Sequence, residues 1–316
     1  MKISVVIPAY NAAASISATL ESVFGQSCKP YEILVLDDGS TDETPALLKA
    51  FEPRIKVYTQ TNSGVAHARN FLCRQTAGDT IAFLDADDVW HPAYLQTQAA
   101  LLNRHPDAVA SFSDHENVQG YSACQWAAQP DEALARSEVI GPVDFMGRYN
   151  RTPLCFQMSC SCVPVRVLHA LGVEPFPVVV SGADDTYFHV KLPLLGNVIY
   201  TPTRLAGYRI TSSSISADRL KMSLQVVKVF EMLAKEYNAA HAPLLGAFRS
   251  AHAARLRNCG KYLMGAGRIT EARRQFFVSA SASSRPRSVA KSLVLYGSSF
   301  LPSLLQPQWP TGRRAS

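Results

Sequence analysis

The chain has 316 residues, of which 47% are hydrophobic and 18% are charged. This composition excludes an intrinsically disordered protein, and the length suffices for a sizeable core with an appended region. The net charge of +6 is unevenly spread, because residues 1–216 carry 15 Lys and Arg against 21 Asp and Glu, whereas residues 217–316 carry 16 against 4. The sequence therefore predicts an acidic body followed by a basic tail.

The first ten residues, MKISVVIPAY, contain one Lys, a short apolar run and a Pro, with no small-residue cleavage site. We interpret them as a first core strand rather than a signal peptide. The seven Cys are scattered without a CxxC pair, so we expect reduced thiols in a cytosolic compartment. Cys160 and Cys162 are expected to be two buried thiols rather than metal ligands.

Strands and helices alternate regularly over the first 115 residues. Apolar, β-branched runs predict strands at 3–7, 32–36, 55–59, 80–84 and 108–113. Helical spacing of apolar residues predicts the intervening helices at 13–27, 43–51, 64–75 and 92–103. This alternation is typical of an α/β fold with a mostly parallel sheet sandwiched by helices.

The second half of the chain changes character twice. Residues 114–150 are polar and irregular, which suggests a substrate-specific insertion. Further strands are expected over 153–164, 197–201 and 204–210, with a helix beginning inside 181–195. Beyond Ser216 the apolar spacing is helical, and no uninterrupted apolar run reaches the length of about 18 residues that a membrane-spanning helix requires.

Polar residues gather where the predicted strands end. Pro8-Ala9-Tyr10-Asn11 follows the first strand, Asp37 and Asp38 follow the second, and Asp85, Asp87 and Asp88 follow the fourth. Ligands of parallel α/β sheets bind at the carboxyl ends of the strands. We therefore expect these three loops to form one site.

The acidic loop admits more than one interpretation. Asp85 and Asp87 are two residues apart, so on an extended backbone they point to the same side and suit a divalent cation that holds a diphosphate. The alternative is that Asp88 caps the helix after Pro92 while the other two carboxylates are solvated. Tyr10 could likewise stack on a nucleotide base or be a packed aromatic residue.

Four segments in fixed order resemble the family 2 glycosyltransferases, which have the GT-A fold. They are PAYNAAASISATLESVFGQS, EILVLDDGSTDET, NSGVAHARNFL and GDTIAFLDADDVWHP. A weaker likeness continues through ADDTYFHVKL and GYRITSSSIS, whereas the last hundred residues carry none. The resemblance implies a GT-A domain over 1–216, with a nucleotide-sugar half at about 1–115 and an acceptor half at about 116–216, followed by a basic helical region over 217–316.

The resemblance also implies roles for individual residues around the nucleotide. The residues that would line the nucleotide pocket, with the tyrosine against the base, are Pro8, Ala9, Tyr10 and Asn11. Asp38 would accept a hydrogen bond from a ring N–H, most naturally that of uracil. Gly64 and Arg69 lie where the family approaches the nucleotide and the diphosphate.

The remaining implied roles concern the metal and the chemistry. Asp85 and Asp87 form the family's Asp-x-Asp motif, which bridges ribose and metal, and Asp88 is a second candidate for the metal contact. Asp185 is the candidate general base, and Asp184 stands where the family often has Glu.

The sequence departs from the family pattern in a segment after the last predicted strand. Thr211 occupies a position where the family often has His, so a contact to metal or diphosphate is missing or replaced there. Arg209 is available to neutralise phosphate charge.

The resemblance thus implies an inverting, metal-dependent glycosyltransferase. The donor would be a nucleotide-diphosphate sugar, with a UDP-sugar expected, and the acceptor a hydroxyl of a glycan or lipid-linked glycan in cell-surface polysaccharide synthesis. The cofactor would be Mn²⁺ or Mg²⁺. Two alternatives stay open: a nucleotide-sugar-binding protein without transfer activity, and a sugar-phosphate nucleotidyltransferase, although the loop PAYNAAAS lacks the basic residue of that class.

The basic tail has two interpretations of its own. Its cations are spread through helices without interleaved aromatic residues or a groove-reading motif, so we expect no nucleic-acid partner. Attraction to anionic lipid headgroups, with 286–305 as an interfacial helix, is one interpretation, and a solvated face on a small helical cap is the other. The first predicts a cytoplasmic protein associated with the inner face of the membrane through 217–316.

Overall fold

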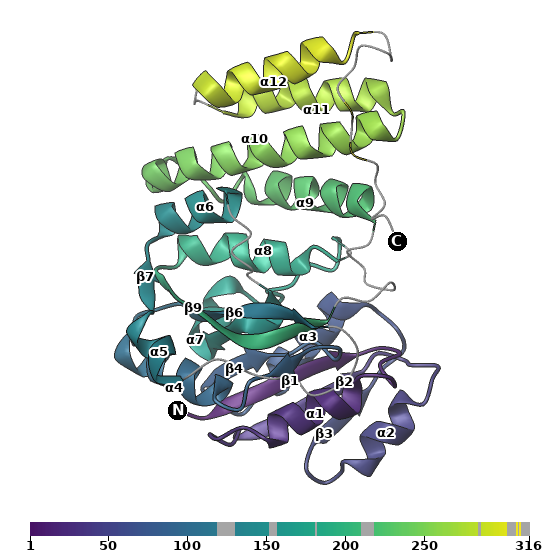
Figure 1. The fold of residues 1–316 in the computed structure, drawn as a ribbon, viewed down its shortest axis with the longest axis vertical. Helices are drawn as coiled ribbons and strands as arrows, with labels where there is room; N and C mark the ends of the chain where they lie inside the picture. The colour runs from purple at the N-terminus through teal and green to yellow at the C-terminus, as the bar shows by residue number, and fades with distance from the viewer. Residues whose placement is uncertain are drawn as a thin grey trace. The chain divides into compact units, whose positions relative to one another are not determined.

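The structure is a computed structural model (Figure 1). It describes residues 1–118, 130–151, 157–180, 182–209, 218–283 and 286–301, with Gln308 and Pro310. The chain divides into two compact units. The first unit comprises Met1–Gly141, Leu154–Val178 and Leu195–Ile210. The second unit comprises Pro142–Pro153, Val179–Leu194 and Thr211–Ser316.

The first unit contains a nine-stranded sheet in the order β3-β2-β1-β4-β8-β6-β9-β5, with β7 paired to β9. The strands are β1 (Ile3–Ala9), β2 (Glu32–Asp37), β3 (Lys56–Thr59), β4 (Thr80–Phe83), β5 (Val89–Trp90), β6 (Ala110–Val118), β7 (Glu138–Ile140), β8 (Ser161–Pro164) and β9 (Val198–Arg209). Strands β1 to β4 are parallel, as predicted, whereas β8 runs antiparallel between β4 and β6. The sheet is therefore mixed, with parallel pairing among β1 to β4 and again between β6 and β9.

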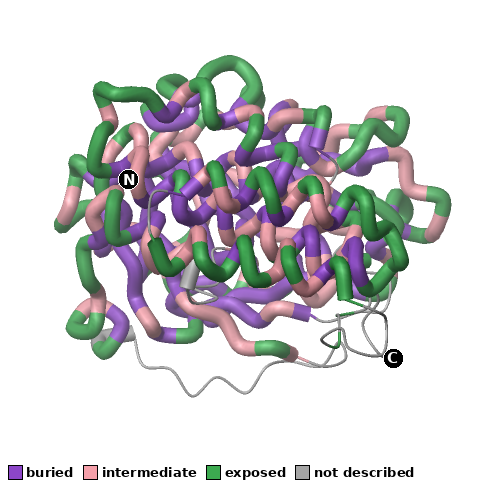
Figure 2. The backbone as a smooth tube through the Cα atoms, turned by 90° about the horizontal axis from the view of Figure 1, so that it is seen from above, coloured by how far each residue is buried: buried purple, intermediate pink, exposed green. Residues whose placement is uncertain are grey.

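Helices cover the parallel strands on both faces. They are α1 (Ile16–Phe24), α2 (Thr44–Ala50), α3 (Val65–Gln75) and α4 (Tyr94–Arg104), joined later in the chain by α5 (Pro130–Ala135), the 3-10 turn η1 (Met158–Cys160) and α7 (Val165–Leu171). The successive β1 residues Val5, Val6 and Ile7 are each 0% exposed. Figure 2 shows the buried parts of the chain in purple, with exposed segments in green. Because neighbouring strand residues face opposite sides, both faces of β1 are buried, which explains its uninterrupted apolar sequence.

Two sequence predictions about this unit need correction. The two strands expected at 197–201 and 204–210 are one strand, β9, because Pro202 lies where the pairing of β6 with β9 shifts register and does not end it. The expected irregular insertion at 114–150 is partly regular, since β6 extends to Val118 and residues 130–151 form α5, β7 and α6 (Pro142–Arg151). Residues 119–129 lie outside the described part of the chain.

The second unit is helical throughout its described residues. Besides α6 it contains α8 (Asp184–Lys191), η2 (Leu192–Leu194), α9 (Arg219–Leu233), η4 (Ala239–His241), α10 (Ala242–Gly265), α11 (Ile269–Ala282) and α12 (Pro286–Ser298). Val227, Leu256 and Phe276 form a buried core between α9, α10 and α11. A Cβ at Gly260 would lie 2.4 Å from the Phe276 ring, so a glycine is required for this close approach of α10 and α11.

The predicted C-terminal helices are thus confirmed. None of the helices in the described ranges combines the length and apolar character needed to cross a bilayer. The domain boundary at 216 stays a prediction, because residues 210–217 lie outside the described part of the chain.

Candidate active site

The carboxyl ends of β1, β2 and β4 lie side by side at one edge of the sheet. Strand β1 pairs in parallel with both neighbours, with Ala9 opposite Asp37 and Val6 opposite Phe83. The pairing continues past the strand ends, since the Asp38 N–H donates to the Ala9 carbonyl oxygen at 2.8 Å. The loops that follow the three strands are therefore neighbours, as the topology rule predicted.

The loop after β1 is fastened to the loop after β2. Asn11 has a positive φ of 48°, its N–H donates to Ser40 Oγ at 2.9 Å, and its Oδ1 accepts from the Thr41 N–H at 2.8 Å. Tyr10, just before it, remains 50% exposed. This exposure favours a residue that can stack on a ligand over a packed core aromatic. Pro8 and Ala9 form the last two residues of β1.

Asp38 is buried and organises the loop before α3. Its Oδ1 accepts from Gln60 Nε2 at 2.7 Å and from the Ser63 N–H at 2.9 Å, and its Oδ2 accepts from the Gly64 N–H at 2.8 Å. Gly64 has a φ of 92°, which a residue with a side chain would adopt only with strain. Three of the roughly four acceptor positions of this carboxylate are thus used within the protein, which leaves room for one further donor.

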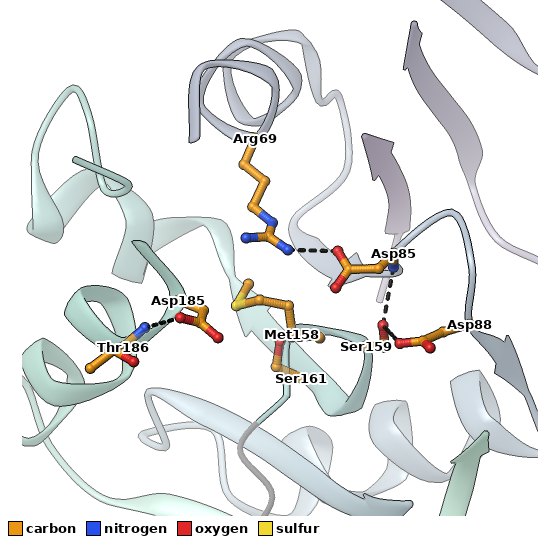
Figure 3. A network of polar contacts seen from close by, with 8 residues as sticks. All are labelled: Arg69, Asp85, Asp88, Met158, Ser159, Ser161, Asp185 and Thr186. Atoms are coloured by element: carbon orange, nitrogen blue, oxygen red, sulfur yellow. Dashed lines mark hydrogen bonds and ion pairs between the residues drawn. The ribbon is translucent and has the colours of Figure 1, made fainter. Parts of the chain in front are cut away.

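The acidic loop after β4 holds its three carboxylates in different environments. Asp85 forms an ion pair with Arg69, with Nη2 and Oδ1 2.6 Å apart (Figure 3). The Asp88 side chain is buried and accepts two hydrogen bonds, from Ser159 Oγ at 2.6 Å and from the Arg209 N–H at 3.0 Å. Asp87 is partly buried, and in the described part of the chain no other side chain donates a hydrogen bond to its carboxylate.

Ser159 joins the two ends of this acidic loop, and sequence reasoning missed it. Its hydroxyl donates to Asp88 and accepts the Asp85 N–H at 3.0 Å (Figure 3). Its carbonyl oxygen accepts from Trp90 Nε1 at 2.6 Å. The only signal in the sequence is a serine inside the apolar segment QMSCSC. Its importance depends on partners about 70 residues earlier, which no local pattern reveals.

Arg209 reaches the same loop from the end of β9. Its Nε donates to the Asp87 carbonyl oxygen at 2.6 Å, in addition to the backbone contact with Asp88. The side chain is buried, at 1% exposure of the residue. A positive charge is thereby fixed behind the acidic loop. Thr211, the expected replacement for a family histidine, lies outside the described residues.

The electrostatics of the acidic loop follow from burial and from like charges. Burial, with the neighbouring charge of Asp85, raises the pKa of Asp87 to about 6. Burial, with the charges of Asp87 and Asp85, holds the pKa of Asp88 well above its ordinary value. A cation placed at this loop would lower both pKa values by offsetting the repulsion.

The donor set fits a hard divalent cation. Carboxylate oxygens are the ligands that Mg²⁺ and Mn²⁺ prefer, and the Asp87 carboxylate is the one not already held by another side chain. No group of three or more His, Cys, Asp or Glu is arranged as a complete metal site among the described residues. The remaining ligands would then come from water and substrate oxygens, as is common for Mg²⁺.

Asp184 and Asp185 belong to the second unit, where they form the first turn of α8. Asp184 is 1% exposed, whereas Asp185 is partly exposed and its Oδ1 accepts the Thr186 N–H at 2.5 Å (Figure 3). A carboxylate is favoured at the amino end of a helix. The more accessible of the two is therefore the predicted base, Asp185.

Comparisons with known proteins agree with this geometry. Residues 4–138 match the family model for Glycosyl transferase family 2. The chain is 28% identical over 223 residues to the Escherichia coli UDP-Glc:alpha-D-GlcNAc-diphosphoundecaprenol beta-1,3-glucosyltransferase WfgD. The alignment covers 69% of this chain and 81% of WfgD. It is 42% identical over 104 residues to the Bacillus subtilis putative teichuronic acid biosynthesis glycosyltransferase TuaG, covering 32% of this chain and 41% of that protein.

Solved structures share the fold. S. aureus TarS in complex with UDP-GlcNAc matches with a TM-score of 0.69 at 17% identity, over 95% of this chain and 90% of that one. The Pyrobaculum calidifontis mannosyltransferase PcManGT in complex with GDP-Man and Mn²⁺ matches with a TM-score of 0.59 at 22% identity, over 96% and 81%. The predicted fold class, an α/β sheet flanked by helices with a helical C-terminal extension, is confirmed.

Proposed function

Because residues 4–138 match the family model for Glycosyl transferase family 2, we propose that the chain belongs to this family and moves a sugar from a UDP-sugar donor to a hydroxyl group of a glycan or lipid-linked acceptor, with inversion at the anomeric carbon. The observation that carries the proposal is that the loops after β1, β2 and β4 are neighbours at one edge of the sheet, and that the last of them carries the partly buried Asp87. Family membership favours glycosyl transfer over the nucleotidyl transfer that the sequence left open.

The donor half of the reaction is assigned to the first unit. Tyr10 offers an exposed ring to the base, and the free acceptor position on Asp38 suits a uracil N–H. WfgD is named for UDP-Glc, and TarS was solved in complex with UDP-GlcNAc. Both support uridine as the nucleoside of the donor. Arg69 and Arg209 supply fixed positive charge beside the acidic loop.

The cation-binding role is assigned to Asp87, with Asp85 beside it. When bound there, Mn²⁺ or Mg²⁺ would stabilise the negative charge that grows on the departing diphosphate. Asp88 takes a positioning role in this proposal, because both of its oxygens accept hydrogen bonds from Ser159 and Arg209. The Mn²⁺ in the PcManGT complex supports the choice of a divalent cation.

The acceptor half of the reaction is assigned to Asp185. A partly exposed carboxylate that is held by a backbone N–H is oriented to take the proton from an incoming hydroxyl group. Asp184 is buried one residue earlier and positions the turn. Attack by the hydroxyl oxygen on the anomeric carbon, opposite the departing diphosphate, needs no nucleophile from the enzyme and inverts the configuration.

The acceptor class follows from the relatives. WfgD is named for a diphosphoundecaprenol-linked substrate and TuaG for teichuronic acid biosynthesis. We therefore propose a lipid-linked or cell-surface glycan acceptor, reached by peripheral association of the basic helices with the inner face of the membrane.

The test is turnover of a panel of UDP-sugars by the purified chain, measured as UDP release with and without Mn²⁺. We expect one donor to be consumed faster when Mn²⁺ and a lipid-linked acceptor are added, and Asp87→Asn to lose this activity. Asp107→Asn, an exposed acid just before β6, is the matched control and should keep it. Tight UDP-sugar binding without turnover on any acceptor would favour a nucleotide-sugar-binding protein instead.

A further inference from the structure

The last described helix, α12, turns a serine inward beside Leu295 and Tyr296 and leaves two large apolar residues facing solvent. Its buried residue is a serine, Ser292, and Ser299 just beyond the helix is also 1% exposed or less. Leu293 and Val294, by contrast, are 52% and 70% exposed. A helix on the surface of a protein ordinarily turns its apolar residues toward the core and its polar residues toward water.

The inward face of α12 is held by polar contacts. Arg257 of α10 donates through Nη1 to Ser288 Oγ at 2.8 Å and to Ser292 Oγ at 3.3 Å, and the Ser292 hydroxyl lies 2.8 Å from Ser279 Oγ of α11. Hydrogen bonds from this partly buried guanidinium therefore help to hold α12 in place, together with the packing of Leu295 and Tyr296 against the core of α9, α10 and α11. The exposed leucine and valine are not needed for that attachment, so their apolar character calls for a different explanation.

The apolar surface continues from α12 onto α11. The Phe277 and Tyr296 rings lie 6.1 Å apart, and the Tyr296 and Phe300 rings 5.2 Å apart. Phe277 is 60% exposed and Phe300 is 55% exposed. We name this surface the outer face; its residues are Phe277, Leu293, Val294, Tyr296 and Phe300. Contiguous exposed apolar residues of this kind mark an interaction site.

The described charges near the outer face are mostly positive. Between Ala272 and Leu301 the charged residues that the structure describes are Arg273, Arg274, Arg287 and Lys291. The acid Glu271, at the start of α11, is paired with Arg268. Arg274, Arg287 and Lys291 are exposed, and Arg273 lies over the Phe300 ring at 3.7 Å. Arg287, Lys291 and Val294 are spaced by four and three residues, so they lie on the same side of α12. Cations therefore border the apolar residues directly.

We propose that the outer face docks onto the surface of an anionic lipid bilayer. Aromatic and aliphatic side chains that enter the headgroup region, bordered by Arg and Lys that meet anionic phosphates, are the features of an interfacial helix. A second copy of the chain is disfavoured as the occupant, because it would bring two positive surfaces together. The inference rests on the membrane association proposed above and assigns it to named residues.

The test is flotation of the full chain with vesicles of phosphatidylcholine alone or of equal parts phosphatidylglycerol and phosphatidylcholine. We expect binding to the anionic vesicles, with partition reduced on the order of a hundredfold in Leu293→Glu/Val294→Glu, since two apolar contacts are lost and two charges oppose the lipid. Val173→Glu, at an 82% exposed apolar position in the first unit, is the matched control and should bind like the unchanged protein.

A second variant separates charge from apolar contact. Arg274→Ser/Arg287→Ser/Lys291→Ser should lose the preference for phosphatidylglycerol, on the order of a hundredfold at low salt. Equal binding of the Leu293→Glu/Val294→Glu variant, or no binding by the unchanged chain, would overturn the proposal. A dimer found by light scattering that this variant disrupts would assign the face to a second copy.

UDP release from the donor sugar alone is measured on the same samples. The outer face has no part in donor chemistry, so its variants should keep this activity. No flotation of the unchanged chain, with intact UDP release, would count against the docking surface only, whereas flotation of the unchanged chain without any turnover would count against the proposed transfer reaction only.

Discussion

The two units of this protein use buried polar groups for opposite purposes. In the first unit, Ser159 and Arg209 hold an acidic loop so that one carboxylate, Asp87, stays available at the edge of the sheet. In the second unit, Arg257 and three serines hold α12 so that its apolar residues face outward. In both places, polar contacts within the protein hold in position a surface that is costly to expose or to charge. The two surfaces, the Asp87 carboxylate and the exposed apolar residues of α12, are therefore the candidate functional surfaces.

The largest expected effect tests whether the second unit also contributes to chemistry. Asp185→Asn should reduce glycosyl transfer by about 10²–10⁴-fold, because the acceptor hydroxyl loses its general base. Donor affinity should be unchanged, since the residues assigned to the donor lie in the first unit. Rates and KM for the donor give the measurement, with Glu231→Gln, an exposed acid on α9, as the control. Equal losses of activity in Asp185→Asn and Glu231→Gln would show that Asp185 is not the general base.

The second unit can be tested alone through its pH dependence. His252 packs against the rings of Phe230 and Phe248, and burial lowers its pKa from 6.5 to about 4. Between these values the unfolded chain binds a proton that the folded chain does not. Stability is therefore fully present above pH 6.5 and falls as the pH drops toward 4, by up to about 3 kcal/mol.

Chemical denaturation at several pH values, followed by far-UV circular dichroism, measures this loss. His252→Gln should remove this decline, because glutamine does not titrate, so that only contributions of opposite sign such as that of Asp87, whose raised pKa is about 6, remain in that window. A variant that keeps the same decline between pH 6.5 and 4 would show that another group is responsible.

The first unit can be tested alone through Ser159. Ser159→Ala removes the hydroxyl group that links Asp85 and Asp88, so the free energy of unfolding should fall by about 1–3 kcal/mol and transfer should slow. Ser161→Ala is the matched control, because this equally buried serine donates to the Met158 carbonyl oxygen and not to the acidic loop. We expect the control to lose stability while keeping its specific activity. Full activity in both variants would contradict the linking role.

The smallest effect concerns the nucleotide base. Tyr10→Ala should weaken UDP binding by about 1 kcal/mol, roughly fivefold, because a stacked ring is lost. Tyr31 is also 50% exposed in the same unit but precedes β2, so Tyr31→Ala should leave UDP affinity unchanged. Calorimetric titration with UDP compares the two. Equal affinities would show that Tyr10 is only a surface residue.

The parts of the fold that depend on local pattern could be predicted from the sequence. The runs ISVVI and EILVL are continuous and β-branched because both of their faces are buried, and the parallel order then places Tyr10, Asp38 and Asp87 at one edge. The contacts of Ser159 could not be predicted, because they join residues about 70 positions apart. The assignment of Asp185 to the second unit could not be predicted either. Its helix, α8, lies apart in sequence from α9 to α12, and the periodicity of apolar residues does not show that these helices belong to one unit.

The outward orientation of Leu293 and Val294 on α12 could likewise not be predicted from the sequence. The sequence predicted an apolar, basic helix near 286–305, but leucine and valine in such a helix are ordinarily packed inside. Only the contacts of Arg257 with Ser288 and Ser292 show that the serine side is the inner one. Residues 302–307 lie outside the described part of the chain.

The central claim, that Asp87 binds a divalent cation which holds the donor diphosphate, is tested most directly by titrating Mn²⁺ into the protein with UDP at pH 7 and at pH 5. The raised pKa of Asp87, about 6, means that below this pH a cation must displace a proton from the carboxylate. We therefore predict that Mn²⁺ binding weakens between pH 7 and pH 5 by roughly tenfold more in the unchanged protein than in Asp87→Asn, which should bind Mn²⁺ weakly at both and keep only the dependence due to the UDP phosphate. Equal Mn²⁺ affinity in the unchanged protein and in Asp87→Asn at pH 7 would contradict the account.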